Sequence, residues 1–173
     1  MKIAFIFVEN KRWWAFLSPI IMKVQGTDFS HCAIAITDPN FATVFHSEWP
    51  KGYCVGAIEF SKTYKIKHHY SFSVSDKMAV NMMHWLANQV RKPYSITQLL
   101  LILIYKYASF LRPMLAKVIV NGDAGDICSE YVSSFLVKFF GVDFYKEDDL
   151  LDLNDVHSMV KRLNEELKWQ SLE

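Results

Sequence analysis

The sequence is poor in cysteine, which excludes a disulfide framework. Its three cysteines, Cys32, Cys54 and Cys128, are odd in number and widely spaced, whereas small secreted domains use close, even-numbered sets. We therefore expect a reducing compartment. No pair of cysteines and no cysteine–histidine cluster has the spacing of zinc ligands, so we expect no metal site and no cofactor.

The chain also lacks a surplus of charge of either sign. Its 19 lysines and arginines nearly balance 18 acidic residues, for a net charge of +1. A general nucleic-acid binder would carry a strong positive surplus, so we expect no nucleic-acid partner. Hydrophobic residues make up 51% of the chain and charged residues 21%, a balance typical of a folded protein. A length of 173 residues suits one domain spanning residues 1–173.

No uninterrupted apolar run is long enough to cross a membrane. The most hydrophobic stretch, residues 96–120, is interrupted by three basic residues and a proline. A transmembrane helix needs roughly 20 consecutive apolar residues. We expect a buried helix there and leave membrane-surface contact open. The apolar run at residues 2–8 is too short for the core of a signal peptide and is followed by charged residues. A cytoplasmic location is therefore expected, or delivery by a phage or virion.

Strand patterns fill the first half of the chain and helix patterns the second. Strands are predicted over residues 2–8, 30–36, 41–47, 55–60 and 65–74. Helices are predicted over residues 12–24, 76–91, 96–120, 128–140 and 155–169. Segregated strands and helices indicate an α+β fold, with a small antiparallel sheet or barrel packed on helices.

The stretch GDICSEYVSSFLVKFF, residues 125–140, places Cys128 at the start of an amphipathic helix. The positive end of a helix lowers the pKa of a thiol, and the thiolate is the nucleophilic form. The backbone N–H at such a helix start can also stabilise an oxyanion. Cys128 is therefore a candidate nucleophile, provided that a base lies near it.

Two of the six histidines are candidate partners for Cys128. His31 opens the strand SHCAIAI, where a bulky polar ring has no packing reason to be, and His46 lies in the following strand. Neighbouring strands can bring one ring to act as base and the other as its orienter. The alternative is two unrelated strand histidines. The other four, His68, His69, His84 and His157, are expected to be surface or core histidines.

The order of these motifs, SHCAIAI early and ICSEYVSSFL late, resembles the circularly permuted NlpC-type hydrolases of the papain-like fold. That family places its histidine in an "SHVAI"-like strand and its cysteine in a "CSELV"-like helix start. Pro93-Tyr94 resembles the segment between the two, and the likeness extends from residue 2 to about residue 156. It implies a permuted papain-like fold with Cys128 as nucleophile, His31 as base and His46 as polar orienter.

The resemblance leaves both the orienter and the substrate open. An acidic residue is common at the position of His46, and Glu48 is a candidate substitute on the same strand face. The implied reaction is cleavage of an amide or peptide bond through a thioester, with Tyr94 and Trp49 lining the substrate site. The alternatives are a thioesterase or acyltransferase on a lipid-like substrate, similar to lecithin:retinol acyltransferase, removal of a protein modifier, or a catalytically silent binding module.

Overall fold

The computed structural model describes residues 1–11, 17–38, 41–48, 50–97, 99–100, 104, 127–142 and 153–170. The elements, in chain order, are β1 (Lys2–Asn10), α1 (Leu17–Gln25), β2 (His31–Asp38), β3 (Phe41–Glu48), β4 (Lys51–Gly56), α2 (Ala57–Thr63), β5 (Tyr64–Ser73), α3 (Asp76–Gln89), α6 (Cys128–Phe140) and α7 (Leu153–Gln170).

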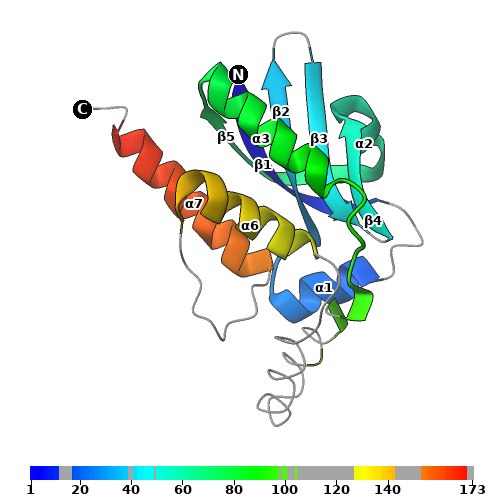
Figure 1. Cartoon of the computed structure of the whole chain (residues 1–173). Helices are drawn as coiled ribbons and strands as arrows, with labels where there is room; N and C mark the ends of the chain where they lie inside the picture. Colours follow the sequence, from blue (N-terminus) through cyan, green and yellow to red (C-terminus); the bar gives the residue numbers. More distant parts are fainter. Residues whose placement is uncertain are drawn as a thin grey trace.

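The strands form an open five-stranded sheet in the order β4-β3-β2-β1-β5, and all neighbours are antiparallel. Helices α3, α6 and α7 cover one face of this sheet, and α2 lies on the other (Figure 1). The predicted α+β class and the antiparallel sheet are therefore confirmed. Most of the helix predicted over residues 96–120 lies outside the described residues.

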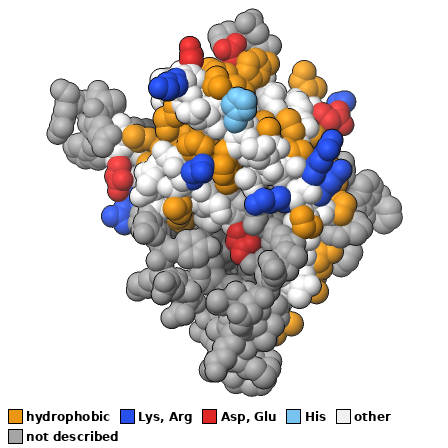
Figure 2. Space-filling view, viewed as in Figure 1, with side chains coloured by type: hydrophobic (Ala, Val, Ile, Leu, Met, Phe, Trp, Pro, Cys, Tyr) orange, Lys and Arg blue, Asp and Glu red, His pale blue; other side chains and the backbone are white. Residues whose placement is uncertain are grey.

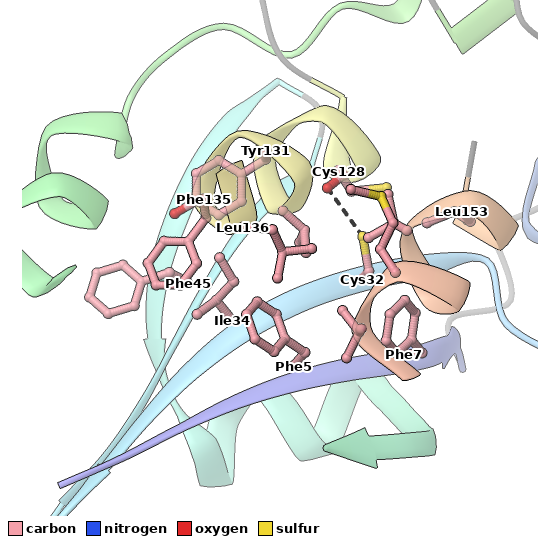
Figure 3. Packing of buried hydrophobic residues seen from close by; sticks show 14 of the residues in the cluster. Phe5, Phe7, Cys32, Ile34, Phe45, Cys128, Tyr131, Phe135, Leu136 and Leu153 are labelled. Atoms are coloured by element: carbon pink, nitrogen blue, oxygen red, sulfur yellow. Dashed lines mark hydrogen bonds between the residues drawn. The ribbon is translucent and has the colours of Figure 1, made fainter. Parts of the chain in front are cut away.

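Alternate residues of the strands enter two hydrophobic clusters, one on each face of the sheet. The larger cluster, under α3, α6 and α7, takes Ile3, Phe5, Phe7, Cys32, Ile34, Ile36, Phe45 and Phe72 from the strands. Phe5 meets Phe135 of α6 there, with ring centroids 5.9 Å apart (Figure 3). The smaller cluster, under α2, contains Ala4, Ile6, Val8, Ala33, Ala35, Val44, Phe60 and Tyr64. Strand alternation places His31 and His46 on this second face, with Ala33 and Val44.

A β-bulge in β5 changes the face to which its first residues point. His68 pairs with Phe7, but the next pair is Val8 with Ile66, so Lys67 is left as an extra residue. An extra residue reverses the alternation beyond it, and bulges often re-aim a side chain in this way. Tyr64 consequently enters the smaller cluster, on the same face as the two histidines.

The strand predicted over residues 55–60 is wrong beyond Gly56, because β4 ends there and α2 begins at Ala57. Only Phe60 of the seven α2 residues is buried, so a short run with one inward side chain gave little periodicity with which to separate helix from strand. Ser75 caps α3, since its side chain accepts a hydrogen bond from the Met78 N–H at 3.3 Å.

The surface in Figure 2 mixes basic, acidic and apolar side chains over the face that carries α3 and α6. This dispersion agrees with the near-zero net charge of the sequence. Within the part of the chain that the structure describes, no helix combines the length and the hydropathy needed to cross a membrane.

Candidate active site

His31 and His46 lie together where strands β2 and β3 diverge. The last registered pair between these strands is Ile34↔Phe45, although β1 and β2 stay paired as far as His31. Nε2 of His31 lies 3.2 Å from Nδ1 of His46, and both side chains are buried. The structure thus brings together the two histidines that the sequence singled out, through a direct ring–ring hydrogen bond.

Cys128 is the first residue of α6, as the sequence predicts. The first N–H groups of a helix have no partner within it and carry partial positive charge, which favours a thiolate at this position. The backbone N–H of Ile127 donates to Oε2 of Glu130 at 3.3 Å, so that carboxylate folds back onto the helix start. Residues 121–126, which precede it in the chain, lie outside the described residues.

The charges of Cys128 and His31 reinforce one another. A hydrogen bond from Cys32 lowers the pKa of the Cys128 thiol most; burial opposes this, but the charge and hydrogen bond of His31 help to hold that pKa well below its usual value. Burial is the largest influence on the pKa of His31 and lowers it, but the charge and hydrogen bond of Cys128, together with the charge of Glu48, outweigh burial, so the net pKa is raised. Opposite shifts of this kind favour a thiolate–imidazolium pair. Because Nε2 of His31 faces His46, Nδ1 is the nitrogen left for the sulfur.

Glu48 acts on this pair through its charge. Its Oε1 accepts a hydrogen bond from Nδ2 of Asn10 at 3.4 Å, and its negative charge contributes to the raised pKa of His31. The ring nitrogen of His31 that points away from the sulfur meets His46. Among the two candidate orienters from the sequence, His46 is therefore the one in hydrogen-bonding contact.

Cys32 is a neighbour of Cys128 that the sequence analysis missed. Strand alternation correctly places its side chain on the face opposite to His31, in the larger cluster. That face is the one onto which α6 packs, and the Cys32 thiol donates to the backbone carbonyl oxygen of Cys128 at 3.1 Å (Figure 3). A burial pattern alone contained no signal for this contact, because it joins residues 96 positions apart.

Aromatic rings surround the two histidines on the face that α2 covers. Tyr64 stacks on His31, with centroids 5.3 Å apart and an interplanar angle of 20°, and meets His46 edge-on. Phe60 stacks on Tyr64 in turn, and Tyr53 stacks on His46. These contacts restrict the rotation of both imidazoles, so the rings are held in the orientation that the hydrogen bond requires.

Replacing Tyr64 by leucine is expected to raise the pH midpoint of Cys128 alkylation by up to about one unit. The face of an aromatic ring favours a stacked cation by about 0.5–2 kcal/mol, and one pKa unit corresponds to about 1.4 kcal/mol. The His31 imidazolium lowers the pKa of Cys128. Loss of the stacked ring disfavours this imidazolium, so the pKa of Cys128 should rise. Tyr64→Phe keeps the stacked ring and is the matched control; equal midpoints in the two variants would contradict this role.

Tyr94 lies close enough to Cys128 for the charge of the thiolate to change the pKa of its phenol. Burial raises the pKa of its phenol well above the ordinary value, and the negative charge of the Cys128 thiolate adds to the shift. The phenol is therefore a neutral hydrogen-bond donor. Its backbone N–H donates to the Pro50 carbonyl at 3.0 Å, which fixes the segment beside the start of β4. Trp49, the other predicted substrate-binding residue, lies outside the described residues.

Replacing Gly52 by alanine is expected to displace the Tyr94 segment and to lower the free energy of unfolding by about 1–3 kcal/mol. A Cβ at this position would lie 2.9 Å from the backbone oxygen of Gln89. The strand cannot move aside freely, since Gly52 donates to the carbonyl of Lys92 and accepts from the N–H of Arg91. Urea denaturation measures the loss.

Gly56→Ala is the matched control for this substitution. An added Cβ there meets nothing within 4 Å, and the φ of −66° suits alanine, so we expect a change below about 1 kcal/mol. Equal losses in the two variants would show that the close approach to Gln89 is not the cause.

The other four histidines lie apart from Cys128, His31 and His46. His157 of α7 hydrogen-bonds to the Tyr70 hydroxyl at 2.9 Å, and His68 bonds to Asp28 at 2.9 Å. His69 and His84 are exposed. No group of three or more histidine, cysteine or acidic residues in the described ranges is arranged to hold a metal ion.

Comparison of the chain with protein-family models and with curated proteins finds no match. Inferences about its function therefore depend on the site geometry and on the motif resemblance.

Proposed function

We propose that this protein is a cysteine hydrolase of permuted papain-like fold that cleaves an amide or peptide bond through a thioester intermediate. The observation that carries the proposal is the arrangement of Cys128, His31 and His46. The nucleophile begins a helix, its thiol has a lowered pKa, and the partner imidazole, with a raised pKa, hydrogen-bonds a second ring. A nucleophile, a base and a group that orients the base are what covalent acyl transfer needs.

Each residue has a distinct part in the proposed reaction. The Cys128 thiolate attacks the carbonyl carbon, and the backbone N–H of the same residue donates to the oxyanion that forms. The His31 imidazolium gives its proton to the leaving nitrogen as the C–N bond breaks. Water then attacks the thioester carbon, His31 takes a proton from that water, and the C–S bond breaks. His46 keeps the His31 ring in one orientation throughout.

The raised pKa of the Tyr94 phenol supports a place beside the reacting carbonyl. A neutral phenol can donate a hydrogen bond to a substrate without adding negative charge near the thiolate. We therefore assign Tyr94 to substrate binding. The three cysteines Cys32, Cys54 and Cys128 are free, which suits the reducing conditions that thiolate chemistry requires.

A second candidate function is thioester hydrolysis or acyl transfer on a lipid-like substrate. It is favoured by the exposed side chains of Ile96, Leu100 and Ile104, whose spacing of four residues is that of one face of the helix predicted from the sequence. Such an apolar face suits an acyl chain or the surface of a lipid layer. The covalent chemistry at Cys128 would be the same, and only the acyl donor and acceptor would differ.

The proposed function is tested by the pH dependence of alkylation with iodoacetamide, measured residue by residue by mass spectrometry. We expect Cys128 in the folded protein to react well below pH 8.5, the ordinary pKa of a free thiol being about 8.5. Cys54 on β4 is exposed, but the partial burial of its thiol raises its pKa. It should therefore react only at higher pH. If Cys128 reacts no faster than Cys54 at neutral pH, the chain is a binding module on this fold.

A further inference from the structure

The Cys32 thiol takes no part in the proposed acyl transfer, yet it lies against the nucleophile. This thiol donates to the backbone carbonyl oxygen of Cys128 at 3.1 Å, and it lies close enough to the Cys128 thiol to lower the pKa of that group. Figure 3 shows the two residues facing one another between β2 and α6. We propose that Cys32 is a resolving thiol, which closes a reversible disulfide with Cys128 after a hydroperoxide oxidises that residue and so switches the site off.

The two sulfurs differ in the way that this order of events requires. Cys128 keeps 6% of its surface exposed and Cys32 none, so a small oxidant meets Cys128 first. The thiolate is the form that attacks a peroxide. The pKa of Cys128 is lowered, whereas burial and the neighbouring Cys128 charge raise the pKa of Cys32. Cys32 therefore stays a protonated thiol until its partner has been oxidised.

The chemistry balances with a hydroperoxide as the only co-reactant. The Cys128 thiolate attacks hydrogen peroxide, the simplest hydroperoxide; an S–O bond forms, the O–O bond breaks, and the departing hydroxide takes the proton of the His31 imidazolium and leaves as water. The sulfur is now a sulfenic acid. Cys32 attacks it, an S–S bond forms and the S–O bond breaks, and the Cys32 proton leaves with the hydroxyl group as a second water.

The positions of the two cysteines favour this closure over other fates of the sulfenic acid. Cys32 is fixed on β2 and Cys128 on the first turn of α6, two elements packed directly on one another. The sulfur of Cys32 already lies 3.1 Å from the backbone carbonyl oxygen of Cys128, so the two side chains belong to contacting residues and bond formation needs only a local movement. Cys54, on β4, is exposed and would react mainly between molecules. A disulfide at Cys128 removes the nucleophile, and reduction restores it.

The test treats the full-length chain carrying Cys54→Ala with hydrogen peroxide, blocks free thiols with N-ethylmaleimide, and maps the peptides by mass spectrometry. We expect a disulfide joining the Cys32 and Cys128 peptides, with full return of Cys128 alkylation after dithiothreitol. The matched variant adds Cys32→Ser, which keeps a hydrogen-bond donor but no second sulfur. Its Cys128 should proceed to sulfinic acid, with at least about 10-fold less recovery, because that state resists thiols.

This inference rests on the proposed function in one respect only, the ionised thiol of Cys128, and the outcomes separate the two. Suppose that Cys128 becomes a sulfinic acid in both proteins and that Cys32, where it is present, stays a free thiol. This result overturns the switch but not the assignment of Cys128 as the nucleophile. A Cys128 inert to peroxide and to iodoacetamide alike overturns both proposals. Disulfides found only between molecules also overturn the switch.

Discussion

Replacing Cys128 by alanine is expected to lower the turnover of an acyl substrate by about 10⁴-fold or more and to abolish the covalent intermediate. Removal of one member of a nucleophile–base set has effects of this size, because the remaining groups cannot replace a covalent step. A suitable probe is p-nitrophenyl acetate, whose acetyl group should be found on Cys128 by mass spectrometry of the acid-quenched enzyme. The initial burst of nitrophenol should disappear in the variant.

Two further variants separate chemistry from folding. Cys128→Ser is nearly isosteric and keeps the helix start, but a serine hydroxyl does not ionise in the range where the thiol does, so its burst should also be lost. Cys54→Ala removes a thiol that is exposed on β4 and should leave the burst unchanged. An acetyl group found on Cys54 or on a lysine, with Cys128 unmodified, would contradict the assignment of the nucleophile.

The parts of this site that sequence patterns predicted are those fixed by local periodicity. The helix start at Cys128 follows from the apolar spacing of residues 128–140, and the strands of His31 and His46 follow from short apolar runs with turn residues between them. Consecutive antiparallel strands are neighbours as a rule, which made a histidine pair a reasonable hypothesis. Its contact distance of 3.2 Å could come only from the structure.

The parts that sequence patterns missed depend on irregular or long-range geometry. Strict alternation along β5 would place Tyr64 on the same face as Phe72, but the bulge at Lys67 reverses it and brings the ring onto His31. No residue type in KIKHHYSFSV signals that bulge. The contact of Cys32 with Cys128 depends on where α6 crosses β2. Helix crossing is set by the packing of whole faces rather than by the residues beside the cysteine.

Replacing His31 by alanine is expected to lower the rate of Cys128 alkylation at pH 6 by more than about 100-fold. The charge and the hydrogen bond of His31 lower the pKa of Cys128, while burial raises it. Without the imidazolium, only the hydrogen bonds from Cys32 oppose burial, so the pKa of Cys128 should move up toward the ordinary value. A thiol of pKa about 8.5 is ionised to only about one part in 300 at pH 6.

The sign of the pH dependence distinguishes an ion pair from an ordinary thiol. A lowered pKa keeps Cys128 reactive above that pKa, and reactivity is lost only as the pH falls through it. In His31→Ala the loss should begin at higher pH.

His46→Ala should lower the alkylation rate less, by about 10-fold, because His46 acts only through the ring that it orients. The change should nearly vanish when His31 is already alanine. His84→Ala, at an exposed position of α3, is the control. An unchanged midpoint in His31→Ala would show that the helix start and Cys32 alone lower the pKa of Cys128, and that His31 is not its base.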